Sequence, residues 1–338
     1  FSAPRFSKVA MSCYYSHSSI SFKSQYSTHC AFNSDPLCSF EETILPSEII
    51  KSKGFQKSRK ILDNDNWPSG CDHCRLPELK SLTSSRHDHP IEHKNLERIE
   101  IRFSNACNMT CLHCGPEFSS LWAKKLNYSG PVLGLSSEQV LKICEDLKNI
   151  PTIRRVVLSG GEPLVNKNFY KCADSLSEHP QASEMVVSFH TNLNPGLPID
   201  FDHINSTFGK FKEAYVVVSI DGGKDLYPIF RGGDWKTLVH NIDKALCMNI
   251  NVDATMSLTT YQMNDIKNCY LDVLPFGFRE LRTMYINSPE EFDPKHAVND
   301  ETMKNYNFVL DHIRDNYSGS LHDSALWYLN ICKERLLR

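Results

Sequence analysis

Short apolar runs alternate with helix-like segments from residue 98 onward, and this alternation limits the possible folds more than any other feature. The apolar runs are rich in β-branched and aromatic residues, which is typical of buried parallel strands. We expect strands at Arg98–Phe103, Arg155–Leu158, Met185–Phe189, Tyr215–Ile220 and Asn251–Leu258. The helices expected between them are Ser136–Lys148, Asn168–Ser177 and Lys236–Met248. Repeated βα units predict an α/β fold with a parallel sheet, whose functional loops follow the carboxyl ends of the strands.

The 338 residues suffice for one large domain or two domains. Ahead of the alternating region we expect short strands near Ser18–Phe22 and Ser27–Phe32 and a helix over Pro46–Asp63. The polar stretch 81–94 is interpreted as a link. Three segments are therefore predicted: an N-terminal module at 1–94, the main α/β domain at 95–290 and a C-terminal helical segment at 291–338.

The composition is that of an ordinary soluble globular protein. A net charge of −3 provides no broad positive field, so we expect no nucleic-acid partner. No apolar run approaches the roughly 20 residues that cross a bilayer, and the start lacks a secretory-signal layout. Thirteen cysteines could form disulfides, but disulfide scaffolds are usually short chains. We therefore expect metal or cluster ligation in a reducing compartment, the cytoplasm.

Three of the cysteines, Cys107, Cys111 and Cys114, lie within eight residues directly after the first strand of the series. Thiolates so close together can converge on one inorganic centre. In a four-iron cluster they would leave one iron open to a small-molecule ligand. A zinc site completed by a further ligand such as His113 is the alternative, and the spacing alone leaves both open.

The Cys-x-x-x-Cys-x-x-Cys pattern after a first strand resembles the defining motif of the radical S-adenosylmethionine (SAM) superfamily. Gly160-Gly161-Glu162, after the second strand, resembles the Gly-Gly-Glu motif of that superfamily. The resemblance implies a partial (β/α)6 barrel with a [4Fe–4S] cluster on Cys107, Cys111 and Cys114. It also implies that SAM binds the open iron and is cleaved to a 5′-deoxyadenosyl radical, which abstracts hydrogen from a substrate.

The same resemblance implies which residues contact SAM. Glu162 would accept from its ammonium group, Arg231 would bind its carboxylate, and His113 would pack on its adenine. The full implied set is Gly160, Gly161, Glu162, Thr191, Asn192, Ser219, Arg231 and His113. No hydrogen donor or general base is assigned.

A second cysteine pattern lies upstream. Trp67, Glu78, Ser84 and Arg86 frame a Cys-x-x-Cys pair in an arrangement that resembles the twitch or SPASM modules of some radical SAM proteins, here ahead of the catalytic domain. The resemblance implies an auxiliary [4Fe–4S] cluster. Cys38 could replace Cys13 or Cys30 among its ligands. Zinc on the same thiolates is the alternative. The implied ligands are Cys13, Cys30, Cys71 and Cys74.

Members with such modules often modify ribosomally made peptides. We therefore expect oxidative modification or cross-linking of a peptide, with a reducing partner such as flavodoxin or ferredoxin and no membrane attachment. One alternative is a radical SAM enzyme that acts on a small metabolite or nucleoside. The other is a zinc-binding module without enzymatic activity.

Overall fold

The computed structural model describes residues 13–23, 25–64, 66–79, 84, 86, 95–131 and 134–337. The chain divides into two compact units, each made of separate stretches of sequence. The first unit is Phe1–Ser104, Leu133–Ser159 and Asn168–Val187, and the second is Asn105–Val132, Gly160–Lys167 and Ser188–Arg338. Because these units are not consecutive segments, the three predicted segments stay a prediction. The predicted link at 81–94 lies outside the described residues, apart from Ser84 and Arg86.

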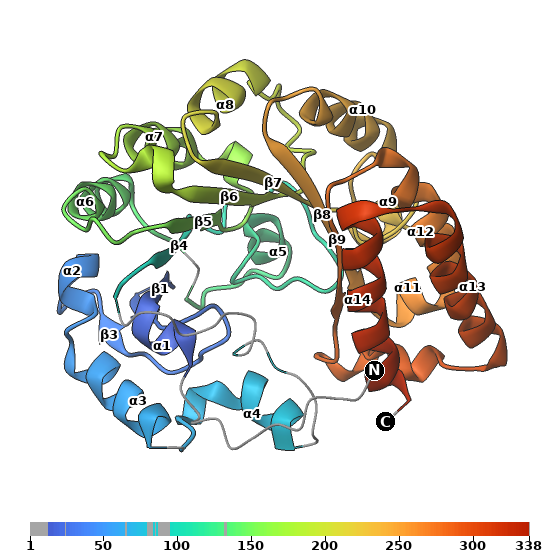
Figure 1. Ribbon diagram of the computed structural model, residues 1–338, viewed down its shortest axis with the longest axis horizontal. Coiled ribbons are helices and arrows are strands. Elements are labelled where there is room, and N and C mark those ends of the chain that lie inside the picture. Colours follow the sequence, from blue (N-terminus) through green and yellow to red (C-terminus); the bar gives the residue numbers. More distant parts are fainter. Residues whose placement is uncertain are drawn as a thin grey trace. The chain divides into compact units, whose positions relative to one another are not determined.

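The first unit contains five neighbouring strands of a sheet, in the order β3-β2-β1-β4-β5. β1 runs parallel to β4 and β4 parallel to β5, whereas β2 is antiparallel to both β1 and β3. Figure 1 shows α6 and α7 on one side of β4 and β5. The strands are β1 (Ser19–Phe22), β2 (Tyr26–Thr28), β3 (Cys38–Ser39), β4 (Arg98–Arg102) and β5 (Arg155–Ser159).

The sequence supplies a side-chain cap for α6, one of the helices of the first unit. The Ser136 side chain accepts from the Gln139 amide, and the Gln139 side chain reaches back, so α6 starts with a capping box. The helices, with α7 counted from its second residue, are α1 (Tyr14–Ser18), α2 (Pro46–Ile49), α3 (Lys53–Asp63), α4 (Asp72–Leu79), α6 (Ser137–Leu147) and α7 (Lys167–Ser177). Two 3₁₀ helices accompany them, η1 (Ser69–Cys71) and η4 (Ala182–Glu184).

The prediction of one helix over Pro46–Asp63 was wrong, because the chain breaks between α2 and α3. Ser52 has an extended backbone, and its side chain accepts from the Phe55 amide as the N-cap of a new helix. A Cβ at Gly54 would lie 1.9 Å from the Leu37 carbonyl oxygen, so the start of α3 approaches another backbone closely. The apolar periodicity continued across this break and concealed it.

The predicted strand Ser27–Phe32 is also shorter than expected, since β2 ends at Thr28. The Thr28 hydroxyl donates to the Cys30 carbonyl at 2.7 Å, and the Asn33 amide donates to the same carbonyl at 3.3 Å. These bonds turn the chain and place Cys30 in a loop.

The second unit contains the parallel strands β7, β8 and β9, which are neighbours in that order. β6 (Val186–Thr191) crosses the division along the chain, since its first two residues belong to the first unit. Buried Val216 and Val218 on β7 and Met256 on β8 contribute to the core. The strands are β7 (Glu213–Ser219), β8 (Asn251–Leu258) and β9 (Leu281–Tyr285).

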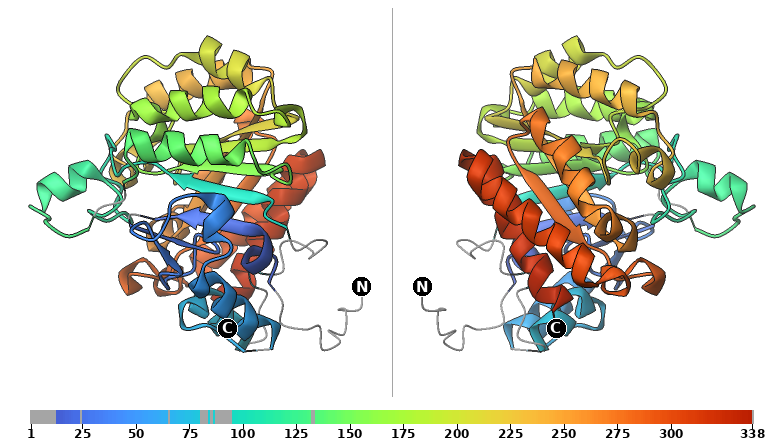
Figure 2. Two further views of the ribbon diagram at one scale, coloured as in Figure 1. Left: turned by 90° about the vertical axis from the view of Figure 1, so that its left-hand side faces the viewer. Right: turned by 90° about the vertical axis from the view of Figure 1, so that its right-hand side faces the viewer.

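The C-terminal part is helical, as expected, and Figure 2 shows α13 and α14 side by side. The helices of the second unit are α5 (Ser120–Lys125), α8 (Phe201–Phe208), α9 (Tyr227–Phe230), α10 (Trp235–Leu246), α11 (Thr260–Asn264), α12 (Ile266–Val273), α13 (Asp300–Asn316) and α14 (Gly319–Leu336). Its 3₁₀ helices are η3 (Pro163–Val165), η5 (Leu274–Phe276), η6 (Glu290–Phe292) and η7 (Pro294–Ala297).

The structure confirms the predicted α/β class with a parallel sheet and a helical C-terminal segment. The five strands expected after residue 97 are all present within two residues of their predicted bounds. Among the helices of the described ranges, none is both long and apolar enough to cross a membrane.

Candidate functional site

The three clustered cysteines lie in the cysteine loop, residues 105–114, which follows β4. The Cys114 amide donates to the Cys111 carbonyl at 3.0 Å, which closes a tight turn between the last two thiols. Burial, then the Cys111 and Cys107 thiols, raise the pKa of Cys114 to about 12. The three sulfurs are therefore within electrostatic range of one another. As thiolates they would require a positive centre between them, which fits an iron cluster.

The segment after the third cysteine anchors this loop through its carbonyl groups. The Ser119 hydroxyl donates to the Met109 carbonyl at 2.7 Å, and the Ser120 hydroxyl to the Cys107 carbonyl at 3.1 Å. The indole Nε1 of Trp122 donates to the Cys111 carbonyl at 2.9 Å. α5 thus holds the backbone at two of the three cysteines, a role that the sequence did not suggest.

Replacing Trp122 with Phe should destabilise the protein by at least about 1 kcal/mol, because Phe lacks the indole N–H that donates to the Cys111 carbonyl and fills less space than the indole. Urea unfolding followed by circular dichroism would measure the change. Trp327→Phe is the matched control, since Trp327 is 51% exposed on α14. Equal stabilities of the two variants would contradict the anchoring role of Trp122.

The Gly-Gly-Glu segment docks directly on the cysteine loop. The Glu162 amide donates to the Ala106 carbonyl at 2.8 Å, and a Cβ at Gly161 would lie 2.4 Å from that same oxygen. Only glycine permits this approach at position 161. Gly160 adopts a φ of +148°, which side chains also disfavour.

Glu162 is buried, and its carboxylate already accepts three hydrogen bonds. The donors are the Leu164 amide at 3.0 Å, the Thr191 hydroxyl at 2.7 Å and the Asn192 amide at 2.6 Å. Burial raises the pKa of Glu162 in spite of these donors. Glu162 therefore joins the loop after β5 to the end of β6. Its predicted contact with the SAM ammonium would use a remaining lone pair.

A chain of asparagines joins the end of β6 to the cysteine loop. The Asn192 side chain donates to the Asn108 side chain at 3.0 Å, and Asn108 in turn donates to the Asn194 carbonyl at 2.7 Å. The predicted Thr191 and Asn192 are thus next to the loop. Ser219 ends β7. Within the described residues, its hydroxyl makes no hydrogen bond to the other residues predicted to contact SAM.

A buried ion pair lies beside the loop. The Arg231 Nη1 donates to the Asp221 carboxylate, which also accepts from the Ser257 amide at 2.6 Å. The His113 Nε2 lies 3.8 Å from the same carboxylate, and the Cys111 Sγ lies 3.7 Å from the Arg231 carbonyl. Burial alone would raise the pKa of Asp221, but Arg231 and then His113 hold it below its ordinary value.

Two buried nitrogens, the Arg231 Nε beside the cysteine loop and the His113 Nδ1 within it, have no hydrogen-bond partner among the described residues. An anionic group of a bound ligand would satisfy such donors. The His113 ring stacks on Phe230 with centroids 5.0 Å apart and planes at 14°. These features fit the predicted SAM contacts of Arg231 and His113. Asp221 had no predicted role, although the Ser-Ile-Asp-Gly run at 219–222 contained the signal.

The family model of the radical SAM superfamily matches residues 101–273, about half of the chain. The chain belongs to the radical SAM superfamily. The cofactors of this superfamily are a [4Fe–4S] cluster and SAM, so the chain is an enzyme. The resemblance inferred from the two sequence motifs is therefore confirmed for the superfamily.

Two curated relatives are GTP 3′,8-cyclases. The one from Campylobacter lari is 24% identical over 213 residues, which cover 61% of this chain and 58% of the relative. That from Clostridium acetobutylicum is 22% identical over 213 residues, 61% of this chain and 62% of the relative. The chain thus spans about three-fifths of the length of these relatives. The solved structure of native anSMEcpe with bound AdoMet has the same fold, with a TM-score of 0.50, 16% identity and coverage of 67% of this chain and 63% of that one.

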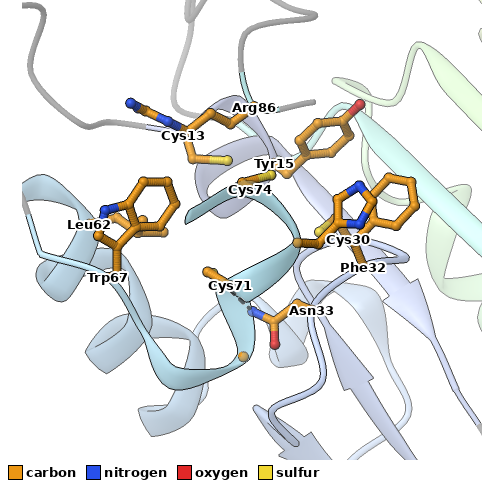
Figure 3. A pocket seen from close by; sticks show the side chains of 12 residues that line it. Cys13, Tyr15, Cys30, Phe32, Asn33, Leu62, Trp67, Cys71, Cys74 and Arg86 are labelled. Carbon is orange, nitrogen blue, oxygen red and sulfur yellow. Dashed lines mark hydrogen bonds between the residues drawn. The ribbon is translucent and has the colours of Figure 1, made fainter. Parts of the chain in front are cut away.

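The four upstream cysteines line one cavity of the first unit, called here the upstream cavity (Figure 3). Cys13 precedes α1, Cys30 follows β2, Cys71 ends η1 and Cys74 lies on α4. The cavity has a volume of about 30 Å³ and is partly open to solvent. Burial and then the neighbouring Cys30 raise the pKa of Cys13 to about 12 and that of Cys71 to about 12.

The four residues that flank the upstream cysteine pair contact one another. The Glu78 carboxylate accepts from the Ser84 hydroxyl and from two Arg86 nitrogens, at 2.6 and 2.7 Å. The Arg86 guanidinium lies 5.1 Å from the centre of the Trp67 ring. This arrangement fixes the segment that carries Cys74.

The four thiols of the upstream cavity are ligand types for either an iron–sulfur cluster or a single zinc ion. Zinc draws four ligands to about 2.3 Å from one point. In the part of the chain that the structure describes, no three His, Cys, Asp or Glu side chains converge on such a point, and this holds for the upstream thiols and for Cys107, Cys111 and Cys114 alike. Cys38 is buried on β3 and does not line the cavity.

Proposed function

We propose that this radical SAM enzyme forms a 5′-deoxyadenosyl radical and uses it in the oxidative modification or cross-linking of a ribosomally made peptide. The observation that carries this proposal is the upstream cavity, in which four thiols from four local elements surround one space. Auxiliary modules of this kind are typical of peptide-modifying members, which the upstream sequence pattern resembles.

The chain would prepare the first site as follows. Cys107, Cys111 and Cys114 would hold the cluster, while α5 keeps their backbone in place. Arg231 would bind the SAM carboxylate through its unpaired Nε, and Glu162 would accept from the SAM ammonium. When bound, the cluster and SAM supply the electron transfer and the carbon radical that abstracts hydrogen.

Cys13, Cys30, Cys71 and Cys74 would hold the auxiliary cluster. Four thiolates close the coordination of all its irons and leave no position for a substrate. When bound, such a cluster supplies an acceptor for the electron that substrate oxidation releases. A flavodoxin or ferredoxin would deliver electrons to the enzyme, and the cytoplasm would keep the thiols reduced.

A second candidate is chemistry on a nucleoside or small metabolite. The two GTP 3′,8-cyclases favour it, because they are similar to this chain over 213 residues. Mass spectrometry of peptides and nucleotides incubated with enzyme, SAM and reductant would decide between the candidates. A mass change in a peptide alone supports the first, and one in a nucleotide alone supports the second.

Replacing Cys71 and Cys74 with Ala should lower the iron content by about four atoms per chain, because the upstream cluster loses two ligands. Iron and acid-labile sulfide are measured after anaerobic reconstitution. Cys38→Ala is the matched control and should leave both values unchanged. An unchanged iron content in the double variant, or zinc without sulfide in the wild type, would reject the auxiliary cluster.

A further inference from the structure

β4 presents two chemically different faces. Successive strand residues point to opposite sides. Ile99 and Ile101 are fully buried on one face, whereas Arg98, Glu100 and Arg102 share the other. Interior faces of parallel sheets are normally apolar. A strand that alternates isoleucine with charge therefore carries a polar surface that packing does not require.

Positive charge dominates the polar face. Its one carboxylate, Glu100, is 5% exposed and accepts from the Arg102 Nε at 2.9 Å. Its other oxygen lies 3.7 Å from the Arg98 Nη1 and has no hydrogen bond within the described residues. Lys23, just after β1, adds a third cation. The β1–β4 register pairs Ser21 with Glu100, so Lys23 comes two residues further along, beside Arg102, and burial together with the charge of Arg102 lowers the pKa of Lys23 to about 8.

Several hydrogen-bond donors on this face are unused. The Arg102 side chain is 19% exposed, and its terminal nitrogens have no partner among the described residues. The Lys23 ammonium makes one hydrogen bond, to the Ala31 carbonyl at 2.5 Å. The Ser159 hydroxyl is buried and has no hydrogen-bond partner within the described residues. Because Arg102 and Ser159 are paired in the β4–β5 register, these donors lie on adjacent strands.

We propose that Lys23, Arg102 and Ser159 bind an oxoanion of the substrate, a carboxylate or a phosphate. They follow or end the parallel strands β1, β4 and β5, and ligands of parallel α/β sheets bind at the carboxyl ends of strands. Glu100 engages the Arg102 Nε and leaves the two terminal nitrogens as a fork that matches two anion oxygens. The inference deepens the proposed function and rests on it for the identity of the ligand as substrate.

Calorimetric titration of the reconstituted enzyme with inorganic pyrophosphate and, separately, with succinate tests this site. We expect at least one probe to bind with a Kd below roughly 10 mM. Arg102→Gln and Lys23→Gln should each weaken that binding about 10- to 100-fold, the usual effect of losing a hydrogen bond from a charged group. Pyrophosphate binding alone would assign a phosphate, and succinate binding alone a carboxylate.

Arg154→Gln is the matched control, because Arg154 is an exposed arginine of the same unit paired with Glu184. Arg102→Lys keeps the charge without the fork and should weaken binding less than Arg102→Gln. If Arg102→Gln does not fold by circular dichroism, Lys23→Gln and Arg102→Lys carry the test. Failure of both probes to bind, or equal binding by wild type and folded variants, would overturn the proposal. Titration needs no turnover, so 5′-deoxyadenosine formation without probe binding would reject this site and leave the proposed function intact.

Discussion

Replacing Cys107, Cys111 and Cys114 together with Ala should abolish 5′-deoxyadenosine formation and lower the iron content by about four atoms per chain. The three thiols share one loop, and the Cys114 thiol is close enough to both others to have its pKa raised by them. Liquid chromatography of a reaction with SAM and dithionite would measure the product.

Cys247→Ala is the control for this experiment, because Cys247 is an exposed cysteine at the end of α10. It should retain both the iron and the activity. The upstream cysteines are unchanged in the triple variant, so its remaining iron should equal that of the proposed auxiliary cluster. SAM cleavage at the wild-type rate by the triple variant would disprove the assignment of these thiols to the catalytic cluster.

Much of the fold was predictable, because burial on both faces gives parallel strands a continuous apolar signal. β8 was predicted to the residue, at Asn251–Leu258. Local backbone geometry was not predictable in the same way. The break before α3 depends on the close approach of Gly54 to the Leu37 carbonyl, and β2 ends where Thr28 bonds the Cys30 carbonyl. Both features depend on atoms that apolar periodicity does not report.

The hydrogen bonds of the candidate site were also not predictable, because they join residues that are far apart in the sequence. The position of Gly160-Gly161-Glu162 after a strand was enough to propose a site residue. The three donors to the Glu162 carboxylate were not visible, because two of them come from Thr191 and Asn192 at the end of another strand. A motif indicates which residue types meet a ligand. It does not reveal which of their hydrogen bonds the fold already uses.

Replacing Arg231 with Met should destabilise the folded protein by about 3–5 kcal/mol, because it leaves the Asp221 carboxylate buried without its cation. Asp221 is 3% exposed and its backbone φ is +49°. Among the described residues it would keep the Ser257 amide and side chain and the weak contact with His113. Urea unfolding of the reconstituted enzyme would give the change in free energy of unfolding. A loss below about 1 kcal/mol would contradict the view that the pair is buried and mutually dependent.

The double variant Asp221→Asn with Arg231→Met separates the ion pair from simple loss of packing. It removes both charges, so it should be more stable than Arg231→Met alone, with a coupling between the two sites in the range of about 0.5–3 kcal/mol. The pH dependence gives an independent check. The folded pKa of Asp221 is held below its ordinary 3.8, so its contribution is complete above that pH and declines as the pH falls further. Asp221→Asn should therefore remove part of the acid sensitivity of the wild type below pH 3.8, whereas a purely steric role for Asp221 would leave that sensitivity unchanged.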